Sequence, residues 1–508
     1  MDITPIGLVR NLLPGFPRFI LTALQATLGV SPNADHQDAV TELIRLVARP
    51  ILGTPSSLVQ SQENSCRDIP IFGPMWIAKC TLLKPETKFR GHDCNLGIEE
   101  AIIKAIDYLG HAQYRGKFPQ IVDVEAEWTG YRGGVSYLAR RPDIPEYEQY
   151  RKLMQEVEPD STTILYFHGG AFCLMDPATH RITTSSLAKH SGGRCLSVRY
   201  RLAPQHVFPA ALLDALVAYL SLLSPPPDSF HTPVPASKIT VAGDSSGAGL
   251  ATSLMLLLLT FRQLNITHLR FHEKDVDISG ENGLTPPAAG LAITSPWLDI
   301  SRSLPSVYRN AKWDIITSPL EDPSSPCPAF PPDSVWPASP PRVETYCEAS
   351  LVSHPLVSPL AASSDIWHGA PPTFICVGWE SMQDESEILA RRLHDAGATV
   401  MFDGSEGMPH CFAVVPWTQR GFSALERWGS FCKDPAVSKA SVSWIKKSGE
   451  ATKVDFSELA ISGERNLNDE TVEKLMIRER ERRVVLEASL VEKWKGKVSV
   501  DRANRMIT

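Results

Sequence analysis

The chain has 508 residues, 43% of them hydrophobic, and a net charge of −7 from 50 Lys and Arg against 57 Asp and Glu. This length exceeds one typical domain, so it predicts a single enlarged domain or a core with extensions. A net negative charge without a long run of Lys and Arg gives no support for nucleic-acid binding.

The first 120 residues contain three stretches that predict helices: 7–29, 37–51 and 98–109. The apolar stretch 16–30 includes Arg18 and is shorter than the ~20 residues that cross a bilayer. We interpret it as a packed helix, with weak association to a membrane surface as the alternative. Asp2 and Arg10 interrupt the amino terminus and no small-residue cleavage site follows, so no secretory signal is expected.

Eight β-rich runs between residues 122 and 432 predict the strands of a central sheet. They are 122–127, 135–139, 163–167, 195–199, 238–241, 289–294, 373–378 and 399–402. Two insertions interrupt this region. The first, 261–287, carries charges and glycine and predicts an exposed loop, whereas the second, 319–342, holds a proline cluster that excludes helix and central strand. The second insertion is either a border of the pocket or a surface loop.

A serine between two glycines follows the predicted strand 238–241. The run Gly243-Asp244-Ser245-Ser246-Gly247 separates that strand from an apolar stretch at 248–260, which predicts strand, sharp turn and helix. A nucleophilic serine needs this arrangement because its hydroxyl must stand clear of the backbone on a strained turn. The flanking glycines let the neighbouring chain pass without a Cβ clash. Ser245 is therefore the candidate nucleophile.

A glycine pair follows the predicted strand 163–167, in the run His168-Gly169-Gly170-Ala171-Phe172. Consecutive glycines free backbone amides to face a ligand, as an oxyanion hole requires. We expect the amides of Gly170, Ala171 and Ser246 to form this oxyanion hole, with Gly169 shaping the turn. A plain turn is the alternative interpretation of the glycine pair.

A serine hydroxyl is a poor nucleophile until a base removes its proton and a third group holds that base. His410 follows the last predicted strand, where such a base belongs. His168 precedes the serine and lies beside the expected oxyanion hole, so we interpret it as a structural residue of the loop. Glu380 leaves the carboxyl end of the strand 373–378, the end at which catalytic groups gather in open α/β sheets.

Asp384 and Asp403 are the alternative acids. Asp384 stands one helical turn beyond Glu380, and we interpret it as a surface or helix N-terminal carboxylate. Asp403 is too near His410 in sequence to span the loop between them. Glu380 is favoured because it leaves the strand end first and can reach across to the last loop.

The ten cysteines are scattered, without a Cys-x-x-Cys pair. Cys195 and Cys376 fall inside predicted core strands, where a thiol packs as a small hydrophobic group. This usage favours a reducing, intracellular and cytoplasmic setting over a disulfide framework, and it lacks the spacing of a zinc site. Beyond residue 433 the strand pattern is lost, and 468–494 predicts an exposed amphipathic helix.

Five motifs are spread over residues 120–430: His168-Gly169-Gly170-Ala171-Phe172, Tyr200-Arg201-Leu202-Ala203-Pro204, Gly243-Asp244-Ser245-Ser246-Gly247-Ala248, Ser295-Pro296-Trp297-Leu298-Asp299 and His354-Pro355-Leu356-Val357-Ser358-Pro359. They resemble blocks of the hormone-sensitive-lipase-like branch of the α/β-hydrolases, which includes carboxylesterases, arylacetamide deacetylases and steryl acetyl hydrolases. In that family the acid stands about 30 residues before the histidine, as Glu380 stands before His410, although the family acid is usually aspartate.

The resemblance implies an α/β-hydrolase fold with a mostly parallel eight-stranded sheet flanked by helices. Residues 1–120 would form an N-terminal helical cap, 121–432 the hydrolase core and 433–508 a C-terminal helical extension. The implied activity is hydrolysis of a carboxylic ester through an acyl-enzyme, by Ser245, Glu380 and His410, without a metal or organic cofactor. Family breadth suggests a bulky apolar small-molecule ester, such as a sterol or polyketide of specialised metabolism.

Two other functions stay open at this point. The same triad could hydrolyse an amide or formamide, or transfer the acyl group to an alcohol. Gibberellin receptors also resemble this family, but they have lost the catalytic histidine, whereas His410 is present here. The sequence does not indicate an oligomeric state.

Overall fold

The computed structural model describes residues 16–53, 56–85, 96–110, 114, 116–280, 285–316, 330–414, 418–461 and 465–505, apart from the side chains of 16–19, 23 and 497–505. In this part of the chain a ten-stranded sheet has the order β1-β2-β4-β3-β5-β8-β9-β10-β11-β12. Its strands are β1 (Met75–Leu82), β2 (Val124–Tyr131), β3 (Thr163–Phe167), β4 (Arg194–Val198), β5 (Ile239–Asp244), β8 (Gly290–Thr294), β9 (Thr373–Gly378), β10 (Val400–Ser405), β11 (Ser441–Ile445) and β12 (Ala451–Lys453). The strands from β4 to β11 pair in parallel, while β1–β2, β2–β4 and β11–β12 are antiparallel.

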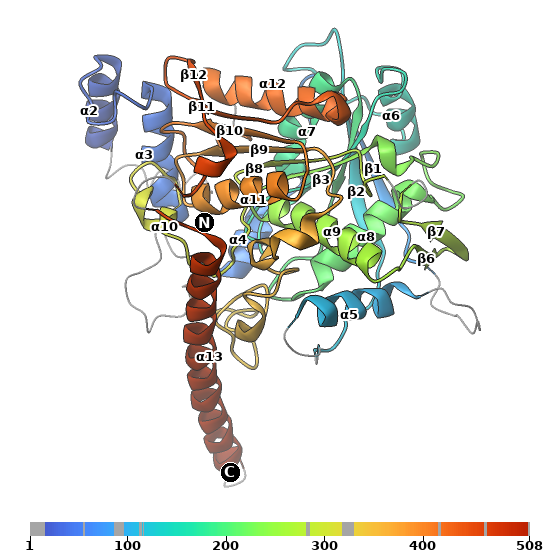
Figure 1. Ribbon diagram of the computed structural model, residues 1–508, viewed down its shortest axis with the longest axis vertical. Helices are drawn as coiled ribbons and strands as arrows, with labels where there is room; N and C mark the ends of the chain where they lie inside the picture. Colours follow the sequence, from blue (N-terminus) through green and yellow to red (C-terminus); the bar gives the residue numbers. More distant parts are fainter. Residues whose placement is uncertain are drawn as a thin grey trace.

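The described helices are α2 (Phe16–Thr27), α3 (Ala39–Gly53), α4 (Leu58–Ser65), α5 (Ile98–Leu109), α6 (Glu146–Leu153), α7 (Arg181–Ser191), α8 (Ala210–Leu223), α9 (Ser245–Gln263), α10 (Ser306–Arg309), α11 (Gln383–Asp395), α12 (Gln419–Lys433) and α13 (Asp469–Arg505). Helices α7 and α12 cover one face of the sheet, and α8, α9 and α11 cover the other (Figure 1). A sheet covered on both faces needs strands that are apolar on both sides.

Strand β3 shows how the sequence meets this requirement. Successive side chains of a strand point to opposite faces, so neighbours in sequence enter different cores. Ile164 and Tyr166 pack in the core beneath α7 and α12, whereas Leu165 and Phe167 pack in the larger core on the other face. Strands buried on both faces therefore appear in the sequence as short continuous apolar runs, which is why they were predictable.

Seven of the eight predicted strands are present, whereas the prediction of a strand at 135–139 is wrong. Its Tyr137 and Leu138 side chains are 82% and 85% exposed, so no apolar burial favours a strand there. The sheet gains β1, β11 and β12, which makes ten strands where eight were predicted. These three lie at the two edges of the sheet, in stretches that we predicted to be cap and C-terminal extension.

The insertion 261–287 is not the exposed loop that we predicted. It forms a hairpin of β6 (His268–Phe271) and β7 (Lys274–Asp277), with positive φ at both residues of its tight turn. The hairpin side chains Leu269, Phe271 and Val276 are buried in the larger core. Apolar side chains that alternate along this charged segment explain why it packs against the body.

The predicted terminal helices are present where the structure describes them, with 7–15 outside the described residues. Helix α2 packs against α3, and α5 packs against α9 of the core. The predicted helix 468–494 is part of the 37-residue α13, which extends away from the body (Figure 1). Its first half is anchored by buried Arg483, which donates to Glu344 Oε1 at 2.7 Å and to the Ser301 carbonyl at 2.7 Å.

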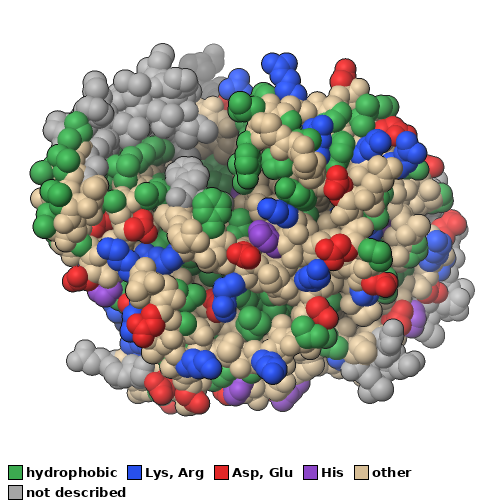
Figure 2. All heavy atoms as spheres, turned by 90° about the horizontal axis from the view of Figure 1, so that it is seen from above, with side chains coloured by type: hydrophobic (Ala, Val, Ile, Leu, Met, Phe, Trp, Pro, Cys, Tyr) green, Lys and Arg blue, Asp and Glu red, His purple; other side chains and the backbone are tan. Residues whose placement is uncertain are grey.

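Figure 2 shows acidic and basic side chains interspersed over the face of the molecule that carries α12. Hydrophobic side chains gather at one edge of this view, over the N-terminal helices α2 and α3 (Figure 2). The large exposed apolar residues of this stretch are Ile20, Leu21, Leu24, Leu28, Val30, Val40, Leu43 and Leu52.

Among the described helices, α9 is the one long and apolar enough to cross a membrane. The molecule buries 94% of that stretch, as expected of a core helix. Helix α9 begins at Ser245, so this buried helix fixes the position of the candidate nucleophile.

Candidate active site

Ser245 lies on a sharp turn where β5 ends and α9 begins. Its φ of 52° is in the left-handed region, which is strained for a residue with a Cβ. A Cβ at Gly243 would come within 2.6 Å of the Gly247 backbone, and one at Gly247 would come within 2.1 Å of the Phe167 carbonyl oxygen. Both glycines are therefore required by the close packing of this turn against the end of β3, and the strained turn presents the Ser245 hydroxyl.

The structure brings Ser245, His410 and Glu380 together from the ends of three strands. The Ser245 Oγ is 2.9 Å from His410 Nε2, and His410 Nδ1 is 3.4 Å from Glu380 Oε1. Glu380 follows β9 and His410 follows β10, while Ser245 follows β5. All three are buried, with Ser245 8% exposed and Glu380 fully enclosed. This is the geometry of a nucleophile, a base and a group that orients the base.

The alternative acids are held elsewhere. Asp384 forms an ion pair with Arg309 at 2.6 Å and accepts the Ser306 N–H at 2.8 Å. Asp403 is held by Arg427 through two hydrogen bonds of 2.5 and 2.7 Å. Glu380 is thus the acid that faces His410.

The second oxygen of Glu380 is fixed by Ser295. The Ser295 hydroxyl donates to Glu380 Oε2 at 3.0 Å and accepts the Cys411 N–H at 2.9 Å. This bridge ties the carboxylate to the backbone beside His410. Burial raises the pKa of Glu380 above its ordinary value, His410 partly offsets the rise, and the Asp314 carboxylate adds to it.

The imidazole of His410 lies near the Cys411 thiol and the Glu380 carboxylate. Burial alone would lower the pKa of His410, but the Cys411 thiol and the Glu380 carboxylate beside it raise this pKa well above its ordinary value. Burial raises the pKa of the Cys411 thiol to about 12, so this thiol is protonated at neutral pH. The carboxylate can therefore stabilise an imidazolium formed when His410 accepts a proton.

The glycine turn after β3 has an unusual backbone. Gly170, Ala171 and Phe172 have consecutive positive φ values of 114°, 54° and 59°. A Cβ at Gly170 would be 2.1 Å from the Leu174 carbonyl oxygen, so only glycine fits there. Within the described residues the amides of Gly170 and Ala171 form no hydrogen bond, and both lie within four residues of the end of β3, which contacts the Ser245 turn.

The other two residues predicted for the oxyanion hole, Ser246 and Gly169, differ in whether the backbone N–H already has an acceptor. Ser246 is in the first turn of α9, where N–H groups have no acceptor within the helix. Its hydroxyl accepts the Phe172 N–H at 3.1 Å, which connects the two loops. The Gly169 N–H instead donates to Asp244 Oδ1 at 3.1 Å and is already occupied.

His168 is fully buried and stacks on Tyr200 with ring centroids 4.3 Å apart. Its Nδ1–H donates to the Gly169 carbonyl at 2.7 Å, and the Tyr200 hydroxyl donates to the His168 carbonyl at 2.7 Å. Burial lowers the pKa of His168 to about 3, so the ring is neutral. These contacts hold the glycine turn, and they keep His168 apart from the Ser245–His410–Glu380 relay.

Sequence reasoning missed the role of Asp244, which directly precedes the serine. Its Oδ1 accepts the Tyr166 hydroxyl at 2.6 Å, and His180 Nε2 lies 3.3 Å from the same oxygen. Burial works against the charge, but His180 and Tyr166 lower the pKa of Asp244 below its ordinary value. Asp244 therefore joins the glycine turn to the serine turn, and its place between Gly243 and Ser245 was the available signal.

The N-terminal segment also contacts the loop that carries His410. The Gln37 amide nitrogen donates to the Gly407 carbonyl at 2.6 Å, and Arg420 donates to the His36 carbonyl at 3.0 Å. The His36 ring lies 4.8 Å from the ring of Trp379, the residue before Glu380. Nothing in the local sequence of this segment indicated these contacts, because they join residues more than 300 positions apart.

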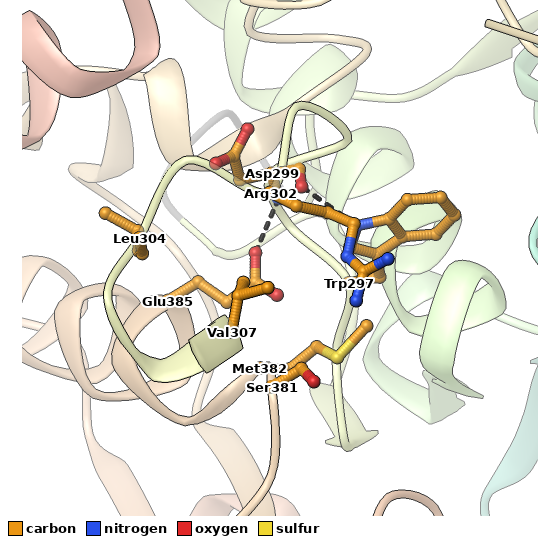
Figure 3. A pocket seen from close by; sticks show the side chains of 8 residues that line it. All are labelled: Trp297, Asp299, Arg302, Leu304, Val307, Ser381, Met382 and Glu385. Atoms are coloured by element: carbon orange, nitrogen blue, oxygen red, sulfur yellow. Dashed lines mark hydrogen bonds between the residues drawn. The ribbon is translucent and has the colours of Figure 1, made fainter. Parts of the chain in front are cut away.

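A small cavity of about 10 Å³ lies beside Ser381, the residue after Glu380. Figure 3 shows Trp297 and Met382 at one side of it, and Glu385 reaching the backbone of Asp299. Glu385 Oε2 accepts the N–H groups of Leu298 and Asp299 at 3.0 and 2.6 Å. The cavity has room for about one water molecule. Within the described residues no three His, Cys, Asp or Glu side chains are grouped as metal ligands.

Comparisons with known proteins find relatives of this chain among the α/β-hydrolases. The family described as alpha/beta hydrolase fold matches residues 164–414. An acetyl-hydrolase from Streptomyces hygroscopicus is 30% identical over 281 residues, covering 54% of this chain and 76% of the relative. Arylacetamide deacetylase-like 3 from Homo sapiens is 26% identical over 293 residues, covering 52% and 70%. A crystal structure of an esterase from the bacterial hormone-sensitive lipase family has a TM-score of 0.44 and 22% identity, covering 83% and 97%.

The chain belongs to the α/β-hydrolase fold family. The enzyme class is that of carboxylic ester hydrolases. The expected fold is thereby confirmed, with ten strands in place of eight.

The packing of the serine turn leads to a test of stability. We expect Gly247→Ala to destabilise the fold by about 1–3 kcal/mol or more, because its Cβ would meet backbone atoms that cannot move aside. Gly496→Ala on α13 is the matched control, since no atom lies within 4 Å of its added Cβ and alanine favours helix. Thermal unfolding of both variants checks this, and equal stability of the two would refute the packing argument.

Proposed function

We propose that this enzyme hydrolyses carboxylic esters through an acyl-enzyme formed on Ser245. The observation that carries the proposal is the contact of Ser245 Oγ with His410 Nε2 at 2.9 Å, with Glu380 on the other side of the ring. A serine hydroxyl becomes a nucleophile when an adjacent imidazole takes its proton, and a buried carboxylate orients that imidazole.

The first half-reaction follows from these positions. Ser245 Oγ attacks the ester carbonyl carbon while His410 Nε2 accepts the hydroxyl proton. The resulting oxyanion is stabilised by the amides of Gly170, Ala171 and Ser246, each worth roughly 2.7–4 kcal/mol in enzymes of this kind. His410 then gives its proton to the leaving alcohol oxygen as the C–O bond breaks, and the acyl group stays on Ser245.

The second half-reaction repeats these roles with water. His410 accepts a proton from a water molecule that attacks the acyl carbon, and it returns that proton to Ser245 Oγ as the carboxylic acid leaves. Glu380 stays ionised and stabilises the imidazolium in both half-reactions. Apart from the ester and water, these steps use only the side chains and amides named here.

The substrate that we propose is a small-molecule ester with a bulky apolar acyl or alcohol part, such as a sterol or polyketide ester of specialised metabolism. Three aromatic rings pack together at Trp379, the residue that precedes Glu380. The ring centroids of His36 and Trp313 lie 5.5 Å apart, and those of Trp379 and Trp313 also lie 5.5 Å apart.

The cellular setting that we propose is reducing and intracellular. Eight described cysteines are free thiols, which supports this setting.

The nucleophile is tested by Ser245→Ala. We expect esterase turnover to fall by roughly 10⁴-fold or more, since the members of a triad act as a unit. A fluorophosphonate probe should label the wild type and not this variant. Ser253→Ala, on the same helix, is the control and should keep activity and labelling. Undiminished turnover in the Ser245 variant would show that another residue is the nucleophile, and an unlabelled wild type would favour a binding protein.

The pH dependence tests the role of the Glu380–His410 pair. Below its pKa His410 carries a proton and cannot accept another, so kcat/KM is low in acid and rises as the pH passes that pKa. The raised pKa predicts that the rise has its midpoint above 6.5, the ordinary value for histidine. Glu380→Gln removes the charge that favours the imidazolium, so the midpoint should move down by about 1 unit or more.

The same variant should lower kcat by roughly 10²–10⁴-fold, because the imidazole loses its orienting charge. Stopped-flow or plate assays of ester hydrolysis from pH 5 to 10 measure both effects. A midpoint that stays in place in Glu380→Gln would mean that Glu380 does not act on His410.

The substrate class is tested with two ester series. One lengthens the acyl chain of p-nitrophenyl esters from acetate to palmitate, and the other enlarges the alcohol of acetate esters from ethanol to a sterol. We expect kcat/KM to rise by about 10-fold or more along at least one series, as apolar contacts of roughly 0.8 kcal/mol per buried methylene accumulate. A maximum at the smallest member of both series would contradict a bulky substrate. Adding an alcohol to the assay distinguishes hydrolysis from acyl transfer. Acyl transfer forms the ester of that alcohol, whereas hydrolysis releases the free acid.

A further inference from the structure

Asp314 lies between the turn that carries Glu380 and the loop that carries His410. Its Oδ2 accepts both the N–H and the hydroxyl of Ser381 at 2.7 Å, and Ser381 directly follows Glu380. Its Oδ1 accepts the backbone N–H of His410 at 3.1 Å and that of Ile316 at 3.2 Å. One buried carboxylate thus binds the backbone on both sides of the acid–base pair.

The segment that carries Asp314 is itself anchored to the acid turn. The Asn310 amide donates to the Glu380 carbonyl at 2.9 Å and to Gln383 Oε1 at 2.6 Å. The Trp313 N–H in turn donates to the Asn310 carbonyl at 2.9 Å. The segment that carries Asp314 is therefore fixed relative to Glu380, and the Asp314 side chain accepts the backbone N–H of His410.

The energetics explain why a carboxylate is needed here. Asp314 is fully buried, and a buried charge is tolerated only when its oxygens are hydrogen-bonded. Each oxygen receives two donors, and hydrogen bonds to an ionised acceptor are roughly twice as strong as those between neutral groups. An amide has one acceptor oxygen, so it could serve Ser381 or His410 but not both.

We propose that Asp314 is a positioning residue of the hydrolase, which holds the Glu380 turn and the His410 loop in register so that the relay to Ser245 can form. This inference rests on the proposed function of the three relay residues. Asp314 touches neither the substrate nor a reacting atom. It acts through the backbone of Ser381 and His410.

This positioning role predicts a specific effect on the kinetics. A misplacement of about 1 Å in reacting groups can cost roughly 10²-fold in rate. Loss of Asp314 should disturb the Glu380–His410–Ser245 geometry and leave the binding of the ester's apolar parts unchanged. The loss should therefore appear in kcat and in the chemical reactivity of Ser245, and not in KM.

The test is Asp314→Asn, assayed for kcat, KM and the rate of Ser245 labelling by a fluorophosphonate. We expect kcat and the labelling rate to fall together by about 10–100-fold, with KM within about 3-fold of the wild type. The matched control is Asp403→Asn, which changes another buried carboxylate in the same way. Asp403 lies on β10 and binds Arg427 of α12, and none of its contacts in the described part of the chain is with the relay. This control should therefore keep wild-type kcat even if its melting temperature falls.

Ser381→Ala provides a second, milder variant in case Asp314→Asn does not fold. It removes one donor to Asp314 Oδ2 and keeps the backbone N–H bond, so kcat should fall by a smaller factor, about 2–10-fold. Because the two residues share one contact, the double variant should lose less than the product of the single losses.

The outcomes separate this inference from the proposed function. A wild type that neither hydrolyses esters nor reacts with the fluorophosphonate overturns both. An active wild type with unchanged kcat in Asp314→Asn overturns the inference alone, as does unchanged kcat in Ser381→Ala if the first variant is unfolded. Equal losses of kcat in Asp314→Asn and Asp403→Asn would also overturn it, since any buried charge would then suffice.

Discussion

The contact between the serine turn and the end of β3 is the constraint from which the site is built. Gly247 approaches the Phe167 carbonyl so closely that a methyl group has no room, and this contact sets the serine turn beside the glycine turn. Ser245 then has to adopt a positive φ, a local strain that the buried helix behind it maintains. Asp244 completes the unit, because its side chain accepts the Gly169 N–H across the same junction. The nucleophile and the expected oxyanion amides are consequently held together by contacts between these two turns.

The acid and base are held differently, by a buried polar network. Ser295 links Glu380 to the backbone at Cys411, and Asp314 links Ser381 to the backbone at His410. Hydroxyl and backbone N–H groups supply these bonds. Inside a low-dielectric site such bonds are strong when satisfied and costly when broken. The network therefore connects the turn that carries Glu380 to the loop that carries His410.

This division explains how much of the site could be predicted from the sequence. Ser245 was predictable because its turn needs glycines at fixed short spacing, and His410 and Glu380 because each follows an apolar strand. Asp314 was not, since its four bonds reach residues as far as 96 positions away and no local pattern marks it. Strand β1 at one edge of the sheet and the pair β11–β12 at the other were missed for a related reason. An edge strand is buried less evenly than a central one, so its apolar run is weaker.

The N-terminal region is more closely joined to the core than a cap lying over a pocket. Strand β1 pairs with β2 along all eight of its residues, and α5 packs on α9, so parts of the first 120 residues belong to the sheet and its covering layer. Gln37 bonds to Gly407 within the same loop that carries His410. The Gln37 side chain is 1% exposed, and a buried amide that loses its partner costs about 1–3 kcal/mol. Movement of this segment away from the body would break that bond, so the position of the histidine loop and the position of the N-terminal segment are energetically coupled.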